Sequence, residues 1–118
     1  MKRNKYIFGA GSNPHPGAVN VDRLRLPGIN VIHDLDTYPY PFESGSGLHI
    51  NATHVIEHLA NVPAFMDECW RILQPGGTLY LETPHAKDIA LSFSDPTHKQ
   101  HLTEHSFINY FTLEGIEN

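Results

Sequence analysis

The stretch from His54 to His58 reads H-x-x-E-H, a pattern of residue types that can hold a metal ion. In the inverted zincin motif, two histidines at this spacing bind zinc and the glutamate between them acts as a base. The chain has nine histidines in 118 residues, which keeps a metal hypothesis open. Candidate third ligands lie downstream at His85, His98, His101 and His105. A metal-dependent hydrolase using His54, Glu57 and His58 is one alternative. No spacing singles out one of the four histidines as its third ligand.

A glycine-rich turn that begins at Gly9 is a second stretch with chemical potential. Gly9 and Gly11 let the backbone approach a ligand closely, because glycine adopts positive φ without steric cost. The third glycine of a dinucleotide fingerprint is absent, and Pro14 stands in its place. Asp22 also follows too soon for the usual intervening helix, so a nicotinamide cofactor is disfavoured. Taken alone, the glycines also fit an ordinary tight turn.

Carboxylates end two of the apolar runs that follow the turn. Asp22 closes a run that begins at Val19, and Asp34 comes directly after the run at residues 29–32. A carboxylate at the end of the strand that follows a glycine turn suits the two hydroxyls of a ribose. A solvated turn aspartate is the alternative interpretation of Asp22.

The elements that must position these residues follow from the alternation of apolar runs and turns. Strands are predicted at residues 6–8, 19–21, 29–32, 48–55 and 78–84. Between the last two, apolar residues at helical spacing predict a helix over residues 62–73, with Asn61 as its N-cap and Pro75 just beyond its end. A strand, a helix and a strand at this spacing predict a parallel pair with a right-handed crossover, and hence an open α/β sheet. Ligands of such sheets bind at the carboxyl ends of the strands.

Composition limits the classes of function. A chain of 118 residues with 40% hydrophobic content has the size of one domain, which we expect to span residues 1–118. The formal charge of −5, without a run of like charges, argues against nucleic acid and anionic membranes as partners. With a single cysteine, Cys69, no apolar run long enough for a bilayer and no apolar signal core near the start, a cytoplasmic protein is expected.

Four stretches, taken in order, resemble the consecutive motifs of class I S-adenosylmethionine-dependent methyltransferases. They are IFGAGSNPHPGAVNVD, HDLDTYPYPF, ATHVIEHL and ECWRILQPGGTLYLETPH. The resemblance is closest to small methyltransferases of type 11 and covers about residues 5–111. It implies a Rossmann-like, mainly parallel open sheet with strand order 3-2-1-4-5, here without the family's C-terminal antiparallel strands, and S-adenosylmethionine as cofactor.

The resemblance also implies roles for individual residues. Those expected at the cofactor are Gly9, Ala10, Gly11, Asn13, Asp22, Asp34, Leu35, Thr53 and His54. In the family, the glycine loop lies against the methionine part, the acid matching Asp22 takes the ribose hydroxyls, and the pair matching Asp34 and Leu35 flanks the adenine. The segment matching Thr53 and His54 passes near the sulfonium. His54 and His85 are the candidate catalytic residues, no metal ligand is assigned, and the acceptor is expected to be a small molecule.

Three functions stay open at this point: a methyltransferase, a non-catalytic cofactor-binding or dimerising remnant of that family, and the metal-dependent hydrolase. Some ubiquinone-pathway methyltransferases resemble the HVIEH stretch and bind a divalent ion there through carboxylate and histidine, which leaves a metal near Glu57 and His58 open. The segment from Asp95 onward is expected to cover the substrate opening as a lid. If it forms one helix instead, His98, His101 and His105 share a face.

The strand predicted at residues 78–84 is expected to be a sheet edge, because the family's next strands are missing. Its leucines alternate with polar residues as in a strand that can pair, and proteins rarely leave such an edge bare. The tail over residues 98–111, which carries Phe107, Tyr110 and Phe111, is a candidate cover. In preference to this cover, we expect the same edge to meet its copy across a two-fold axis and form a homodimer.

Overall fold

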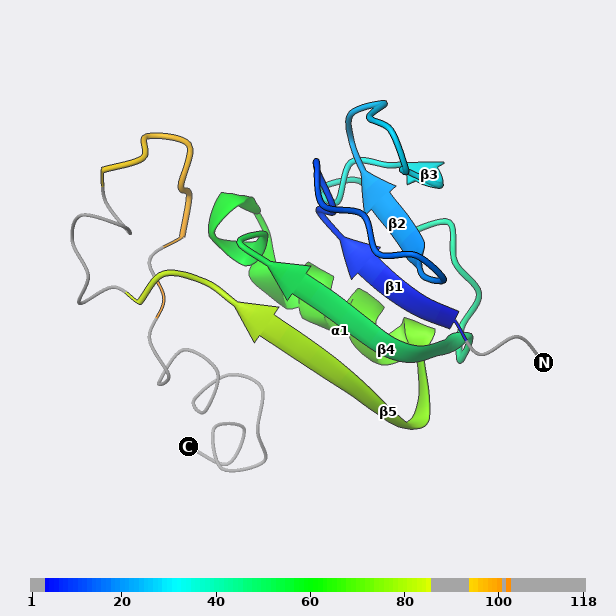
Figure 1. Cartoon of the computed structure of the whole chain (residues 1–118). Helices are drawn as coiled ribbons and strands as arrows, with labels where there is room; N and C mark the ends of the chain where they lie inside the picture. The colour runs from blue at the N-terminus through cyan, green and yellow to red at the C-terminus, as the bar shows by residue number, and fades with distance from the viewer. Residues whose placement is uncertain (1–3, 86–93, 101, 103–118) are drawn as a thin grey trace, which may run out of the picture.

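Five strands form one parallel sheet in the order β3-β2-β1-β4-β5 (Figure 1). This computed structural model describes residues 4–85, 94–100 and 102. The strands are β1 (Asn4–Phe8), β2 (Val19–Asp22), β3 (Val31–Ile32), β4 (Gly47–Thr53) and β5 (Leu73–Glu82). All four neighbouring pairs run parallel. The predicted strand order and the Rossmann-like α/β class are therefore confirmed, and within the described residues no antiparallel strand pair occurs.

Helix α1 (Val62–Ile72) connects β4 to β5 and packs on one face of the sheet (Figure 1). Its start confirms the predicted cap, because the Asn61 side chain accepts a hydrogen bond from the backbone nitrogen of Ala64 at 3.1 Å. Its end comes one residue early, since Leu73 has extended backbone and pairs with Gly47 of β4. The fifth strand thus begins before the expected residue 78. A register irregularity between Gly47 and His49 accommodates the longer strand.

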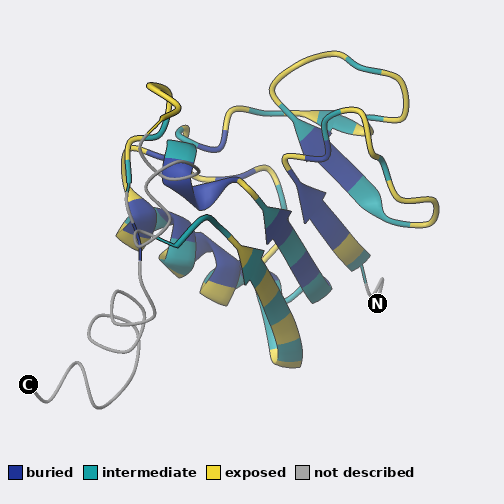
Figure 2. Ribbon diagram, turned by 60° about the vertical axis from the view of Figure 1, so that its left-hand side comes forward, coloured by how far each residue is buried: buried dark blue, intermediate teal, exposed yellow. Residues whose placement is uncertain are grey.

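The core lies between the sheet and α1. Its largest fully buried apolar side chains include Phe8, Ile50, Phe65 and Ile72. Each such side chain contributes about 1.5–3 kcal/mol through removal of its surface from water. Figure 2 shows the buried residues gathered in β1, β4 and the inner side of α1, whereas intermediate and exposed residues alternate along β5. Burial also raises the pKa of the Cys69 thiol to about 12, so this cysteine is an unreactive core residue.

An ion pair on α1 fastens the connection between β3 and β4. Arg71 Nε donates to Glu68 Oε2 at 2.7 Å, and the Arg71 guanidinium also donates to the carbonyl oxygens of Phe42 and Tyr40 at 2.7 and 3.1 Å. The backbone nitrogen of Tyr40 in turn donates to Glu68 Oε1 at 2.6 Å. The Tyr40 hydroxyl donates to the carbonyl of Leu35 at 2.7 Å. This chain of contacts positions the loop that follows β3.

The segment 94–100 lies against the short 3-10 helix η1 (Ile56–His58) that follows β4. The backbone nitrogens of Lys99 and Gln100 donate to the carbonyl oxygen of Glu57 at 2.6 and 2.9 Å. The helix considered for this segment is not present over residues 94–100, where the chain forms a turn. Asp95 Oδ1 accepts from the backbone nitrogen of Thr97 at 2.9 Å, and the backbone nitrogen of His98 donates to the carbonyl oxygen of Asp95 at 3.1 Å, which closes a single turn.

Several expectations fall on residues outside the described ranges. They are the positions of His101 and His105 and the tail beyond Leu102, including Phe107, Tyr110 and Phe111. In the part of the chain that is described, no helix has the length and apolarity needed to cross a membrane.

Candidate functional site

A cavity of about 530 Å³ opens at the carboxyl ends of β1, β2 and β4. Five of the residues predicted from the sequence line it: Gly9, Asp22, Asp34, Leu35 and His54. Its volume lies within the range of small-molecule pockets, and its place is the one where parallel sheets bind ligands. The strand order creates it, because β1 and β4 are neighbours and the connections that leave them run in opposite directions, to β2 and to β5.

The glycine turn is fixed against its neighbours. Gly9 and Gly11 have φ angles of 68° and 55°, in the left-handed region that favours glycine. A Cβ atom on Gly9 would lie 2.6 Å from Val55 Cγ2, so only glycine fits there without a shift of the following loop. The backbone nitrogen of Gly9 donates to the carbonyl of Val21 at 2.9 Å. The turn therefore exposes its backbone to the cavity in one defined conformation.

Asp22 ties the turn to the end of β2. Its Oδ2 atom accepts from the backbone nitrogen of Gly11 at 2.9 Å, and its Oδ1 atom accepts from that of Leu24 at the same distance. Each carboxylate oxygen can accept more than one hydrogen bond. The half-buried carboxylate is thus held in place and keeps accepting capacity on the cavity side. Hydroxyl groups of a ligand are suitable donors to it.

His54 occupies a strained position at the end of β4. It has a φ of 56°, and non-glycine residues rarely adopt this region. Its backbone nitrogen donates to the carbonyl of Glu82 at 2.6 Å, and its Nε2 atom lies 3.6 Å from Glu82 Oε2. Strained residues persist where the surrounding structure holds them, and they concentrate at functional sites. His54 thus joins the end of β5 to the cavity mouth.

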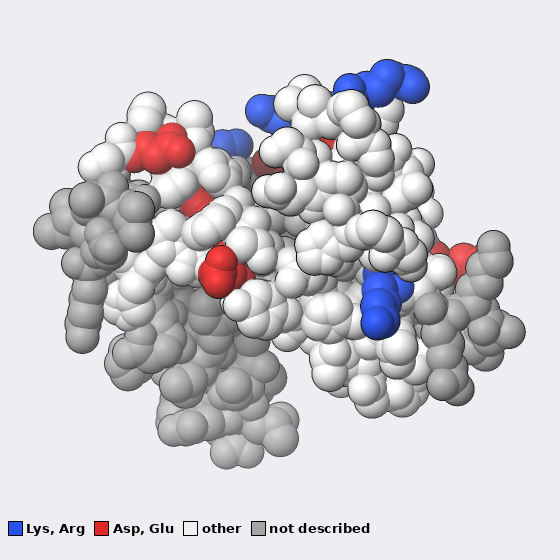
Figure 3. Space-filling model, viewed as in Figure 1, with Lys and Arg blue, Asp and Glu red and all other residues white. Residues whose placement is uncertain are grey.

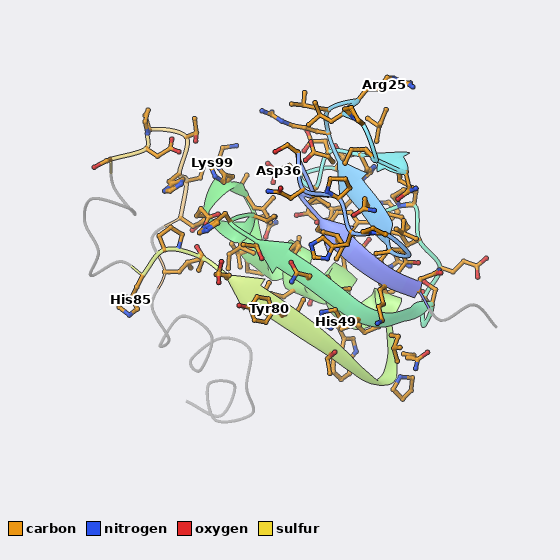
Figure 4. All side chains as sticks on the ribbon, in the orientation of Figure 1. Arg25, Asp36, His49, Tyr80, His85 and Lys99 are labelled. Atoms are coloured by element: carbon orange, nitrogen blue, oxygen red, sulfur yellow. The ribbon has the colours of Figure 1, made fainter. Side chains whose placement is uncertain are left out.

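The other predicted residues do not line the cavity. They are Ala10, Gly11, Asn13 and Thr53, and the candidate base His85. Ala10 is buried beneath the turn, and Asn13 is exposed beyond it. His85 follows the end of β5 and forms a bridge with Leu102. Figure 4 shows its side chain far from Asp36 and Lys99, which are at the cavity.

Other lining residues were missed by sequence reasoning. They are Arg23, His33, Asp36, Thr97 and Lys99; His58, which the sequence offered only as a metal ligand, also lines the cavity. Lys99 Nζ lies 3.7 Å from Asp36 Oδ2, which links the segment 94–100 to the loop after β3 across the cavity (Figure 4). A lid role had been expected for this segment, but nothing in the sequence pairs Lys99 with Asp36. On the face drawn in Figure 3, Lys and Arg side chains are scattered and form no continuous basic patch.

The HVIEH stretch is divided between two environments. The imidazole of His54 lies beside Glu82, whereas Nδ1 of His58 lies 3.3 Å from the carbonyl oxygen of Thr97. Glu57 is buried, and its Oε2 atom accepts a hydrogen bond from the hydroxyl of Thr83. Three residues that could hold a metal together are His58, Asp95 and His98, and His54 is not among them. The zincin pairing of His54 with His58 is thus not assembled in this structure.

Comparison with known proteins gives a consistent assignment. A family model described as a methyltransferase domain matches residues 6–81. A probable S-adenosylmethionine-dependent methyltransferase from Mycolicibacterium smegmatis is 31% identical over 83 residues, which cover 70% of this chain and 32% of the relative. No solved structure matches the chain significantly. The chain spans about a third of the length of the curated relative that it matches.

The matched region contains β2, β3, β4 and α1, most of β1 and β5, and every predicted cofactor residue. Family membership implies S-adenosylmethionine as the cofactor. By its sequence and by its fold, the chain belongs to the methyltransferase domain family.

Proposed function

We propose that this chain binds S-adenosylmethionine in the cavity at the carboxyl ends of β1, β2 and β4, and transfers its methyl group to a small-molecule acceptor. The observation that carries the proposal is the hydrogen bond of 2.9 Å between the Gly11 nitrogen and Asp22 Oδ2. It fixes the glycine turn and the carboxylate of Asp22, which accepts hydrogen bonds, at one cavity. A ligand with a ribose and a charged tail requires both groups. Supporting it are the family match and the relative's name.

The residues present fit this cofactor. Gly9 leaves the backbone accessible on the cavity side, where an amino-acid tail needs close approach. Asp22 supplies accepting oxygens for two ribose hydroxyls. Beside them lie the buried apolar side chain of Leu35 and the exposed carboxylate of Asp34, which suit the face and the amino edge of an adenine. The cavity volume of about 530 Å³ is sufficient for a ligand of this class.

When bound, the cofactor supplies a methyl group that is already activated by a sulfonium. The protein's part is then to hold the acceptor in line and to keep water out. Gly9 and Asp22 orient the ligand from the sheet side. The ion pair of Lys99 with Asp36 joins two segments that line the cavity, namely residues 94–100 and the loop after β3.

An oxygen or nitrogen acceptor must also lose a proton, and we assign the removal of this proton to His54. His54 lines the cavity, and the carboxylate of Glu82, 3.6 Å from Nε2, orients its ring. His85 remains a candidate on sequence grounds. Since it lies outside the cavity lining, the proposal gives it no step.

The location of binding is tested by amide chemical shifts during titration with S-adenosylhomocysteine. The largest changes are expected at Gly9, Gly11, Asp22 and Leu35, with none at Trp70 on the exposed side of α1. Changes confined to regions away from the glycine turn would contradict the proposal. Methyl transfer is tested separately with methyl-labelled S-adenosylmethionine and pools of small hydroxyl and amine compounds. Specific binding without transfer to any pool would favour the non-catalytic remnant.

Three further expectations complete the proposal. The domain is taken to span residues 1–118, and it is taken to act in the cytoplasm without nucleic-acid or membrane partners. A homodimer is expected through the outer edge of β5, where Tyr80 is 48% exposed. The metal-dependent hydrolase gains no support from the separation of His54 and His58, so we do not carry it further.

A further inference from the structure

We propose that His58, Asp95 and His98 form a binding site for a divalent transition metal ion, Zn²⁺ in first place, that fastens the segment 94–100 beside the cofactor cavity. One potential ligand atom from each residue lies within 4.8 Å of the others. His58 belongs to η1, whereas the other two come from the segment after β5. Two of the three ligands therefore lie outside the HVIEH stretch.

The aspartate and one histidine already have the spacing of metal ligands. Asp95 Oδ2 lies 3.5 Å from His98 Nε2. Two bonds of about 2.0–2.1 Å at a tetrahedral angle separate their ligand atoms by about 3.4 Å. The other oxygen, Asp95 Oδ1, accepts from the Thr97 nitrogen and hydroxyl at 2.9 and 2.6 Å, which orients Oδ2 toward His98. Little rearrangement is needed for both atoms to bind one ion.

His58 is held in the form that a metal requires. Its Nδ1 atom lies 3.3 Å from the carbonyl oxygen of Thr97, and a carbonyl oxygen only accepts hydrogen bonds. The proton is therefore placed on Nδ1, and Nε2 keeps a free lone pair. Metal-binding histidines usually make such a bond through the second ring nitrogen. The rings of His58 and His98 meet edge to face, with centroids 4.7 Å apart.

The carboxylate of Glu57 is a second, independent observation that supports a cation at this place. This residue is 1% exposed, and its Oε1 atom has no hydrogen-bond partner within the described part of the chain. The same oxygen lies 3.9 Å from Nε2 of His58. A buried carboxylate oxygen without a partner is costly, so a positive charge at this place explains its position. Glu57 would complete the site as a fourth ligand or through a bound water.

The donor set selects the kind of ion. Two imidazoles with carboxylates favour Zn²⁺ and its neighbours in the transition series, whereas Mg²⁺ prefers six oxygen ligands in an octahedron. Since zinc accepts four-coordinate sites made of histidine and carboxylate, it is the ion to which we commit.

Such an ion would affect the cavity directly. His58 lines the cavity from η1, and Thr97 and Lys99 line it from the segment that carries the other two ligands. Fixing the two parts together removes motion that a bound ligand would otherwise have to stop. This consequence rests on the proposed function, and by linkage zinc and S-adenosylhomocysteine should each strengthen binding of the other.

The site is tested by equilibrium dialysis against Zn²⁺ and by the visible spectrum of the Co²⁺-loaded protein. Wild type should bind one ion per chain, with the spectrum of a four-coordinate site. Asp95→Asn and His98→Gln should each weaken binding at least tenfold. His49→Gln is the matched control, because His49 pairs with Thr78 in the sheet and is remote from Lys99 in Figure 4. Circular dichroism establishes that each variant is folded.

Two outcomes would overturn the site. One is unchanged zinc affinity in both Asp95→Asn and His98→Gln. The other is loss of binding in His54→Gln with retention in His98→Gln, since that pattern belongs to the HVIEH stretch alone. The fastening role fails if zinc leaves the affinity for S-adenosylhomocysteine unchanged. If the wild type binds zinc but no S-adenosylhomocysteine, the proposed function fails and the metal site is supported.

Discussion

Two clusters of charged side chains in this molecule differ in how completely their hydrogen bonds are satisfied. In the first, both carboxylate oxygens of Glu68 accept hydrogen bonds, and Arg71 donates to Glu68, to two backbone carbonyls and to Ser44. In the second, around Glu57 and His58, the buried Oε1 atom of Glu57 has no such partner among the described residues.

The difference separates a structural cluster from a functional one. In the first cluster, the charges of Glu68 and Arg71 pair with each other and hold the loop that carries Leu35 and Asp36 against α1. The second includes His58, which lines the cavity, and it keeps one accepting oxygen of Glu57 unused, as binding sites do at a cost in stability. The experiments below compare the two regions, from the largest expected effect to the smallest.

Removal of the Arg71 side chain should have the largest effect on folding. Arg71→Ala leaves the largely buried Glu68 carboxylate without its ion partner, which is expected to lower the free energy of unfolding by about 3 kcal/mol. Urea denaturation measures this loss. Arg25→Ala is the control, because Arg25 is exposed on the loop after β2 and should change stability by less than about 0.5 kcal/mol. Equal effects of the two variants would show that the cluster does not hold the loop.

A methyl group on Gly9 should be more harmful than one on Gly17. Both glycines have positive φ, at 68° and 81°, but a Cβ at Gly17 meets nothing within 4 Å. Gly17→Ala is thus expected to cost about 1 kcal/mol from backbone strain alone. Gly9→Ala adds the contact with Val55, so it should cost about 2 kcal/mol or more. Truncation of Val55 to Ala in the Gly9→Ala background should recover the difference, and failure to do so would place the cost elsewhere.

Acid should weaken the structural cluster through Glu68. Hydrogen bonds from Arg71 hold the pKa of this carboxyl below its ordinary value of 4.5. A group with a lowered pKa in the folded state contributes stability above its unfolded pKa, and this contribution is lost as pH falls through the folded pKa. The unfolding free energy of wild type should therefore fall more steeply below pH 4.5 than that of Glu68→Gln. Parallel curves for the two proteins would contradict this assignment.

Assembly through the β5 edge is expected to have the smallest effect on the free energy of unfolding. It is detected instead as a change in molecular mass. Sedimentation equilibrium at micromolar protein is expected to show a dimer, and Phe111→Asp is expected to dissociate it. A single species of 13.3 kDa for wild type would reject the dimer.

The sheet was predictable because each strand has a local signature. Apolar runs that are followed by glycine or aspartate indicate β1 to β3, the run from Leu48 indicates β4, and the Asn61 cap defines the start of α1. The beginning of β5 was not predictable in this way, because the pairing of Leu73 with Gly47 joins residues that are distant in sequence. Local patterns cannot report such a contact.

The candidate site divides in the same way. Gly9, Asp22 and His54 were predicted from motifs that are continuous in sequence, and the structure places all three at the cavity. The pair of Lys99 with Asp36 and the cluster of His58 with Asp95 and His98 were not predicted. Both depend on the return of the segment 94–100 to η1, which backbone hydrogen bonds to Glu57 create.

Calorimetric titration with S-adenosylhomocysteine tests the central claim most directly. Wild type should bind one ligand per chain, and Asp22→Asn should weaken binding about 10- to 100-fold, as expected for the loss of charge-assisted hydrogen bonds worth about 1.5–3 kcal/mol. Asp67→Asn, which removes an exposed carboxylate from α1, should bind as wild type does. Equal affinities of wild type and folded Asp22→Asn, or no binding by wild type at millimolar ligand, would contradict the proposal that this cavity holds the cofactor.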